Sequence, residues 1–332
     1  MKQETNNSSR FFITGDCHGD FEKIEFFCRY HETTPDDCMI ILGDAGINFC
    51  MDHRDEELKN ALDKMPLTFL CVHGNHEERP YNISSYRTKV WHGGLVYYED
   101  AHSTILFAKD GEMYEMNGKK VIAIGGAYSG DKAFRIMLGL PWFPDEQPSK
   151  EIKKYVEAQL DKQQWTVDYV LSHTCPMVYE PREKYQNMVD AKTIDKSTEQ
   201  WLDQIAKRLT YKCWYFGHYH DNVAYDDAEL LYEEIKELGE KDFLQKLGRP
   251  KYRVKECVFF PVKNDGREED GYGVIEQIHE YGTENQRKEI SYHIKGIICG
   301  NPDQKMDFPQ VKESVIESRS EEHTSELQSR GT

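Results

Sequence analysis

The sequence predicts an α/β domain that contains a second, partly antiparallel sheet, and a small β domain after it. Three observations lead to this prediction. Short apolar runs that stop at glycine alternate with helical patterns early and late in the first 225 residues. Between residues 95 and 124, β-like stretches are separated by turn pairs. After Tyr225 the chain becomes acidic and then rich in strand-forming residues.

The early segments read as strand, polar cluster and helix, repeated. We expect strands at residues 10–14, 39–42 and 67–72, where apolar runs stop close to a glycine. Two helices are expected at residues 20–30 and 54–64, where apolar residues recur at helical spacing. Asp20 is a candidate cap for the first of these helices. The alternation predicts the core of an α/β domain.

The middle of the domain predicts hairpins and then an irregular excursion. Asp110-Gly111 and Asn117-Gly118 are hairpin turn pairs. The flanking β-like stretches cover residues 95–98, 104–108, 113–116 and 121–124. Residues 125–148, rich in glycine, aromatics and proline, are expected to pass over the surface near a site. The alternation then resumes, with helices at 149–163 and 197–209 and strands at 167–171 and 212–216.

These patterns divide the chain into four parts. The first domain is expected at residues 1–226, followed by an acidic helical linker at 227–247. A small β-barrel-like domain is expected at 248–318. Residues 319–332 resemble the translation of a sequencing-adapter oligonucleotide, and we expect a non-native or disordered tail there.

Composition excludes some classes of function. The 332 residues carry a formal net charge of -17, which disfavours nucleic acid and anionic membranes as partners. No apolar run approaches the roughly 18 residues that a membrane helix needs. The nine cysteines form no CxxC pair, which indicates reduced thiols and a cytoplasmic location. The C-terminal domain has no basic stripe, so a protein contact is the default expectation for it.

Five polar clusters stand where strands are expected to end. They read GDCHGD at 15–20, GDAG at 43–46, GNHE at 74–77, SH at 172–173 and GHYH at 217–220. Asp16 and His18 can ligate one metal from a single turn, and Asp44 can bridge two metals with its two oxygens. Oxygen and imidazole ligands of this kind suit Mn²⁺, Fe, Zn²⁺ or Co²⁺. Two such ions about 3.5–4 Å apart can hold a shared hydroxide and a phosphate.

The ordered clusters resemble the calcineurin-like metallophosphoesterases, whose pattern is D-x-H, G-D, G-N-H-[ED], H and G-H-x-H. The resemblance spans Arg10 to Asp221, and the text between the blocks is similar to the bacterial branch of that family. It implies a four-layer αββα sandwich of two mixed sheets flanked by helices. It also implies hydrolysis of a phosphomonoester or phosphodiester by a metal-bridging hydroxide, with a histidine as general acid.

The resemblance also assigns site residues. By motif, the first metal would be bound by Asp16, His18, Asp44 and His220. The second would be bound by Asp44, Asn75, His173 and His218. His76 matches the catalytic histidine, which is not a ligand and would protonate the leaving group. Two divalent ions are implied, with Mn²⁺ first and Fe, Zn, Co or Ni as alternatives.

Substrate contacts are less well defined by the sequence. Arg79 follows GNHE and can reach a phosphate, although a surface salt bridge is an equal alternative. Asn75 and Arg135 are weaker candidates for substrate binding. The arginines typical of protein Ser/Thr phosphatases are missing, which disfavours that branch.

Two alternative functions stay open. A nuclease of the same superfamily would need a basic track beside the site, which the net charge disfavours. A non-catalytic scaffold for protein binding would be expected to lack a ligand or His76, and none is missing.

Overall fold

The computed structural model divides into two compact units, Met1–Gly239 and Glu240–Thr332. It describes residues 9–181, 194–239, 257–264, 267–279, 291–298, 301–312 and 318–319. The first unit contains the five polar clusters and runs past the boundary expected at residue 226. Each unit is described by itself.

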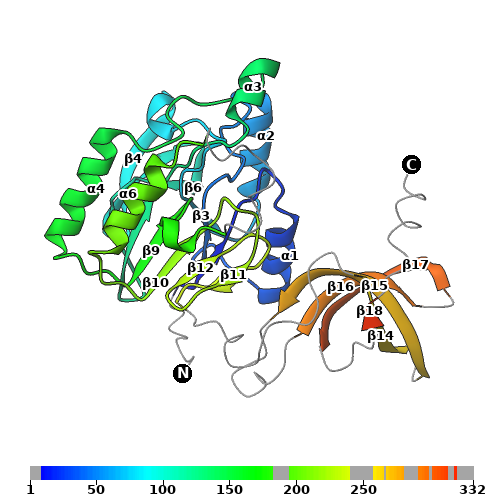
Figure 1. The fold of residues 1–332 in the computed structure, drawn as a ribbon. Coiled ribbons are helices and arrows are strands. Elements are labelled where there is room, and N and C mark those ends of the chain that lie inside the picture. Colours follow the sequence, from blue (N-terminus) through cyan, green and yellow to red (C-terminus); the bar gives the residue numbers. More distant parts are fainter. Residues whose placement is uncertain are drawn as a thin grey trace, which may run out of the picture. The chain divides into compact units, whose positions relative to one another are not determined.

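A seven-stranded mixed sheet forms one half of the first unit (Figure 1). Its strands are β1 (Phe11–Thr14), β2 (Cys38–Ile41), β3 (Thr68–Cys71), β4 (Tyr86–Trp91), β5 (Gly94–Glu99), β6 (His102–Ala108) and β13 (Lys236–Glu237). They lie in the order β13-β1-β2-β3-β6-β5-β4. The four central strands β1, β2, β3 and β6 are parallel, and the strands at both edges are antiparallel.

A six-stranded mixed sheet forms the other half. Its strands are β7 (Met113–Met116), β8 (Lys119–Ile124), β9 (Tyr169–Ser172), β10 (Cys213–Phe216), β11 (Val223–Ala224) and β12 (Ala228–Leu230). They lie in the order β11-β12-β10-β9-β8-β7. Strands β8, β9, β10 and β12 are parallel, so this sheet also has a parallel centre and antiparallel edges.

The described helices of the first unit are α1 (Glu22–His31), α2 (His53–Leu62), α3 (Lys132–Leu138), α4 (Lys150–Lys162) and α6 (Ser197–Ala206), with 3₁₀ turns at Pro80–Asn82 and Met177–Tyr179. Helices α1 and α2 pack on the outer face of the first sheet, and α4 and α6 pack on that of the second, whereas α3 buries none of its residues. Side-chain caps start two of them, because Asp52 accepts from the Arg54 N–H and Ser149 accepts from the Ile152 N–H. Among the described helices, none has the length and apolar character needed to cross a bilayer.

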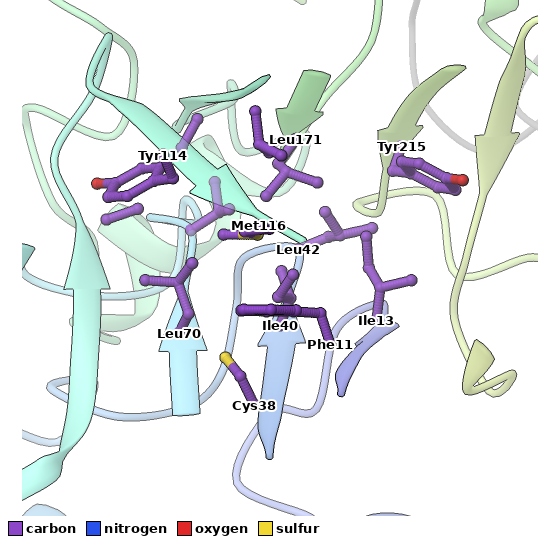
Figure 2. Close-up of a cluster of buried hydrophobic side chains, with 14 of the residues drawn as sticks. Phe11, Ile13, Cys38, Ile40, Leu42, Leu70, Tyr114, Met116, Leu171 and Tyr215 are labelled. Carbon is purple, nitrogen blue, oxygen red and sulfur yellow. The ribbon is translucent and has the colours of Figure 1, made fainter. Parts of the chain in front are cut away.

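Three buried apolar layers hold these elements together. Alternate residues of β1 face opposite ways: Phe11 and Ile13 pack between the sheets, whereas Phe12 packs under α1. Figure 2 shows the layer between the sheets, where Ile40 and Leu70 lie below Met116 and Leu171. A third layer joins the other sheet to α4 and α6. Helix, sheet, sheet and helix therefore stack in four layers, which confirms the expected sandwich.

Some local expectations were wrong. Strand β4 was not predicted, because its charged and exposed residues conceal a strand at the sheet edge. Residues 228–230 and 236–237, expected in a helical linker, are the strands β12 and β13. Glu229 and Lys236 form a buried ion pair there, with 2.7 Å between Oε2 and Nζ. Tertiary pairing thus overrides the helical pattern. Residues 240–247 of that linker lie outside the described residues.

The described part of the second unit is one antiparallel sheet. Its strands are β14 (Cys257–Asn264), β15 (Arg267–His279), β16 (Ser291–Ile298), β17 (Asn301–Lys312) and β18 (Ser318–Arg319), in the order β17-β16-β15-β14-β18. Within these ranges the pairing does not close on itself, so the β character is found and the expected barrel-like closure is not. The tail expected from residue 319 has Arg319 in β18, and residues 320–332 lie outside the described ranges.

One buried histidine ties α2 to the first sheet. His102 begins β6 and its side chain is 4% exposed. Its Nδ1 lies 2.5 Å from Asp63 Oδ2, and its Nε2 lies 3.1 Å from Glu56 Oε1. Burial opposes the charged form of His102, but the hydrogen bonds to Asp63 and Glu56 outweigh it and raise its pKa.

This raised pKa predicts a pH-dependent stability. The contribution is fully present below the unfolded-state pKa of about 6.5 and is lost as pH rises through the higher folded-state value. We expect His102→Gln to lower the free energy of unfolding more at pH 5.5 than at pH 9. Urea unfolding in metal-free buffer measures this difference. An equal loss at both pH values would contradict the prediction, and His53→Gln, at an exposed site, should change little.

Candidate metal centre

All five polar clusters lie at the carboxyl ends of parallel strands. Asp16 and His18 follow β1, Asp44 follows β2, and Asn75 and His76 follow β3. His173 follows β9, and His218 and His220 follow β10 in the other sheet. Because the carboxyl ends of parallel strands form one edge of a sheet, each sheet presents its loops there. The two edges meet, so the site takes ligands from both sheets.

A first group of candidate ligands contains Asp16, His18 and His220, with one ligand atom from each within 4.8 Å of the others. The two imidazoles face each other, with 2.9 Å between the Nε2 atoms of His18 and His220. His220 Nε2 also lies 3.2 Å from Asp16 Oδ2, and His18 Nε2 lies 3.7 Å from it. The buried Oδ2 of Asp16 still accepts no well-formed hydrogen bond.

A second group contains Asp16, Asp44 and His173. His173 Nδ1 lies 2.8 Å from the Leu42 carbonyl, which can only accept, so Nδ1 carries the proton. In the neutral ring, Nε2 then presents a lone pair toward Asn75 Oδ1 at 2.8 Å and Asp44 Oδ2 at 3.6 Å. Three lone-pair atoms converging in a buried place are what a cation requires.

His218 and His76 adjoin these groups without belonging to them. The ring of His218 meets the ring of His173 edge to face, with centroids 5.0 Å apart. The His218 backbone N–H donates to Asp16 Oδ1, and the His76 N–H donates to Asp44 Oδ1, each at 2.8 Å. Asp16 belongs to both ligand groups. The family resemblance instead assigns the position between the two metals to Asp44.

The loops that carry these side chains are strained. His18, Asp44, His218 and His220 have φ values of 49°, 46°, 69° and 48°, in the left-handed region that such residues rarely adopt. Strain of this kind costs about 1–3 kcal/mol per residue and concentrates at functional sites. Four such residues are candidate ligands at this one edge, which is consistent with a functional site there.

Two glycines allow the carboxylates to sit against the backbone. A Cβ on Gly74 would lie 2.0 Å from Asp44 Oδ1 and 2.2 Å from the Asp44 nitrogen. A Cβ on Gly217 would lie 2.3 Å from Asp16 Oδ1. Any larger residue at either position must displace a candidate ligand.

The pKa shifts of Asp16, Asp44, His18 and His218 favour the protonation states that bind metals, whereas the hydrogen bond to Asp16 raises the pKa of His220. Burial raises the pKa of Asp44, but the charges of His173 and His76 outweigh it, so the net shift is downward. For Asp16, the neighbouring His220 and His173 likewise overcome burial and lower its pKa. Burial lowers the pKa of His18 and holds that of His218 well below its usual range. Ionised carboxylates and neutral imidazoles are the forms that coordinate metals.

The donor set fits divalent transition ions. Carboxylate, amide and imidazole donors of this kind suit Mn²⁺, Fe²⁺, Co²⁺ or Zn²⁺. In the neutral His173 ring, Nε2 and Asn75 Oδ1 face each other as two acceptors, and the buried Asp16 Oδ2 accepts no hydrogen bond from the described residues. The residues present therefore fit a site for bound cations.

The two candidate arginines have different surroundings. Arg79 is 2% exposed, and its Nη1 donates to Asp110 Oδ2 at 2.7 Å while Nε donates to the Asp145 carbonyl at 2.8 Å. The Arg79 guanidinium therefore forms a buried ion pair with Asp110, rather than the phosphate contact or the surface salt bridge that the sequence left open. Arg135 on α3 reaches the site instead, with Nη2 3.5 Å from His76 Nε2.

Several residues at this site were not found from the sequence. The ring of Tyr232 stacks on His220, with centroids 4.7 Å apart and planes 12° from parallel. Lys23 Nζ donates to the Asp16 carbonyl at 3.3 Å. Ser129 accepts from Asn75 Nδ2 at 3.0 Å. Ser129 lies in the loop that follows β8, another parallel strand. That location was the one feature of the sequence that could have indicated a role for Ser129 at the site.

Comparison with known proteins identifies the family. A sequence profile described as calcineurin-like phosphoesterase matches residues 9–222. The match spans more than half of the chain, so the chain belongs to the calcineurin-like phosphoesterase family. This confirms the resemblance stated above, and it supports phosphoester hydrolysis in general. No curated protein matches the chain.

Two solved structures are similar to this chain at low identity and low TM-score. Phosphopantetheinyl hydrolase (PptH) from Mycobacterium tuberculosis is 11% identical, with 71% of this chain and 98% of that chain covered and a TM-score of 0.37. The protein of unknown function AQ665 from Aquifex aeolicus is 13% identical, with 50% and 81% covered and a TM-score of 0.27. Neither likeness carries an argument about function.

The packing of Gly74 generates a testable prediction. We expect Gly74→Ala to displace Asp44 and to weaken Mn²⁺ binding by about 10–100-fold, the range seen when ligand-positioning residues change. Isothermal titration calorimetry measures the affinity. Gly118→Ala is the control for glycine replacement, because no atom lies within 4 Å of the added Cβ. Unlike Gly74, Gly118 has a positive φ of 71°, so its variant carries local backbone strain without a displaced ligand. Unchanged Mn²⁺ binding in Gly74→Ala would refute the geometry.

Proposed function

We propose that this chain hydrolyses a phosphomonoester or phosphodiester with two divalent metal ions held between the carboxyl edges of its two sheets. The observation that carries the proposal is the pair of ligand groups that share Asp16. One group alone would fit a mononuclear site. Two groups with a common carboxylate support two neighbouring ions, as two-metal hydrolysis requires.

The ligand sets follow from the described positions. We assign Asp16, His18 and His220 to one ion, and Asp44, Asn75 and His173 to the other, with His218 beside His173. Either carboxylate can lie between the ions, Asp16 by its geometry here and Asp44 by the family pattern. Two bound ions, which we propose to be Mn²⁺, would supply Lewis acidity toward phosphate oxygens and would activate a hydroxide nucleophile.

His76 is placed to act as the general acid. Its backbone N–H is fixed by Asp44 Oδ1, so its position depends on a metal ligand. Its ring lies beside that of His18, with centroids 5.9 Å apart. Burial and the charge of Arg135 lower the pKa of His76, so we propose that the anionic substrate phosphate favours the protonated ring, which would then give its proton to the leaving oxygen.

Arg135 is placed to hold the substrate phosphate. Its Nε donates to Asp131 Oδ2 at 2.7 Å and its Nη1 donates to the Pro141 carbonyl at 3.2 Å. These contacts leave Nη2 directed at His76. A guanidinium fixed in this way can donate to phosphate oxygens beside the general acid.

The setting of the reaction is proposed from composition. The net charge of -17 favours a small phosphoester over a nucleic acid, because the surface repels polyanions at long range. The described cysteines are free, which supports a reducing, cytoplasmic setting.

Removing the general acid or a ligand should abolish turnover in different ways. We expect His76→Ala to lower kcat for Mn²⁺-dependent hydrolysis of a nitrophenyl phosphomonoester or diester by about 10²–10⁴-fold. Metal binding should persist in His76→Ala and weaken in Asp44→Ala. His53→Ala, on the exposed start of α2, is the control. A wild-type protein that binds Mn²⁺ but hydrolyses no phosphoester would favour the scaffold hypothesis.

The role of Arg135 can be tested separately. We expect Arg135→Gln to lower kcat/KM by about tenfold to a hundredfold, because hydrogen bonds to charged groups contribute about 1.5–3 kcal/mol. Mn²⁺ affinity should not change. Arg87→Gln removes an arginine whose side chain is 68% exposed and should leave kcat/KM unaltered. Equal kcat/KM values for Arg135→Gln and wild type would show that Arg135 does not contact the substrate.

A further inference from the structure

A chain of hydrogen bonds runs from a candidate metal ligand to the segment that carries Arg135. Asn75 Nδ2 donates to Ser129 Oγ at 3.0 Å, and Ser129 Oγ donates to Glu146 Oε2 at 2.6 Å. Trp142 Nε1 donates to the same Glu146 oxygen at 2.7 Å. Asn75, Ser129 and Glu146 are 1%, 1% and 2% exposed, so water does not compete for these bonds.

The direction of each bond follows from its chemistry. The indole N–H of Trp142 can only donate, so Glu146 Oε2 is an acceptor. An ionised Glu146 carboxylate can only accept, so the Ser129 hydroxyl is the donor in the bond between them. Ser129 has one proton, which it gives to Glu146. Ser129 can therefore only accept from Asn75, and it selects the NH₂ end of the amide.

This direction decides which end of Asn75 faces the ligands. With NH₂ turned toward Ser129, Oδ1 lies 2.8 Å from His173 Nε2, among the lone pairs of the second group. A flipped amide would present NH₂ to that group, and an amide nitrogen does not coordinate a divalent ion. The Ser129–Glu146 pair thus removes the unproductive orientation.

The same two residues close the base of the segment that holds α3. Ser129 lies before α3, and Glu146 lies after it. The Ala127 N–H donates to the Glu146 carbonyl at 3.2 Å, and a Cβ on Gly126 would lie 2.5 Å from that oxygen. The two ends of the segment are therefore held together directly behind Asn75.

We propose that Ser129 and Glu146 are positioning residues, which orient the Asn75 amide so that its oxygen faces the second metal ion. The inference rests on the proposed two-metal function and extends it. Neither residue touches the substrate or a metal. They act through Asn75. Their loss weakens the binding of the second ion and leaves the binding of the first unchanged.

Ser129→Ala tests the proposal with the smallest change. It removes the acceptor for Asn75 while Glu146 keeps its bond from Trp142. We expect the second Mn²⁺ to bind about 10–100-fold more weakly, as for other residues that orient metal ligands, and the first Mn²⁺ to bind as in the wild type. Titration calorimetry gives both affinities. The spin-coupled EPR signal of the Mn²⁺ pair should appear only at higher Mn²⁺ concentration.

A pair of variants at position 146 separates positioning from packing. Glu146→Gln keeps one oxygen that can accept from both Ser129 and Trp142, so it should bind the second Mn²⁺ within about threefold of the wild type. Glu146→Leu removes the acceptor and should resemble Ser129→Ala. Ser103→Ala, at an exposed site on β6, is the control for serine loss.

The possible results separate a failure of the positioning role of Ser129 and Glu146 from a failure of the proposed two-metal function. If the wild type binds two Mn²⁺ ions and Ser129→Ala binds both with unchanged affinity, the inference is overturned and the proposed function stands. If the wild type binds fewer than two ions, the proposed function fails and the inference fails with it. Thermal denaturation without metal checks folding, and Ser129→Ala suffices should Glu146→Leu not fold.

Discussion

The metal centre depends on the packing of the two sheets against each other, because neither sheet holds enough ligands alone. Several contacts cross the interface at the site. His173 Nδ1 donates to the Leu42 carbonyl, the His218 N–H donates to Asp16 Oδ1, and Gly217 leaves room for the Asp16 carboxylate. The apolar layer behind them fixes the distance between the sheets. A hydrophobic core thus sets the geometry of a polar site.

The site concentrates costs that the rest of the fold must offset. The Asp16 and Asp44 carboxylates are buried beside the His173 imidazole, and four candidate ligands adopt left-handed backbone conformations. Each strained residue costs about 1–3 kcal/mol. Such conformations persist where the surrounding structure determines them fully, here through hydrogen bonds from the backbone to Asp16 and Asp44. Bound cations would remove the remaining repulsion among the lone pairs, so metal binding should also stabilise the fold.

The sequence predicted the parts of this structure that have local patterns. Strands that end in Asp, Asn or His clusters predicted one edge, and the structure brings Asp16, Asp44 and His173 together there. It could not predict Ser129 or Tyr232, because a serine and a tyrosine in loops have no spacing that reveals a partner far along the chain. The helix expected at 227–247 failed for a similar reason. Its acidic pattern was local, whereas β12 and β13 form through pairing with β10 and β1.

Under the proposed function, the segment around α3 would connect substrate selectivity to metal binding. Helix α3 buries none of its residues and has only seven of them, so neither packing nor intrinsic helix stability fixes it. Its position depends on the contacts of Arg135 and on the closed base at Ser129 and Glu146. That base also touches Asn75. A substitution that shifts α3 to accommodate another substrate would therefore also displace the candidate ligand Asn75. Substitutions confined to the outer face of α3 would leave Asn75 in place. Substrate preference should accordingly vary most easily on that outer face, with the base left unaltered.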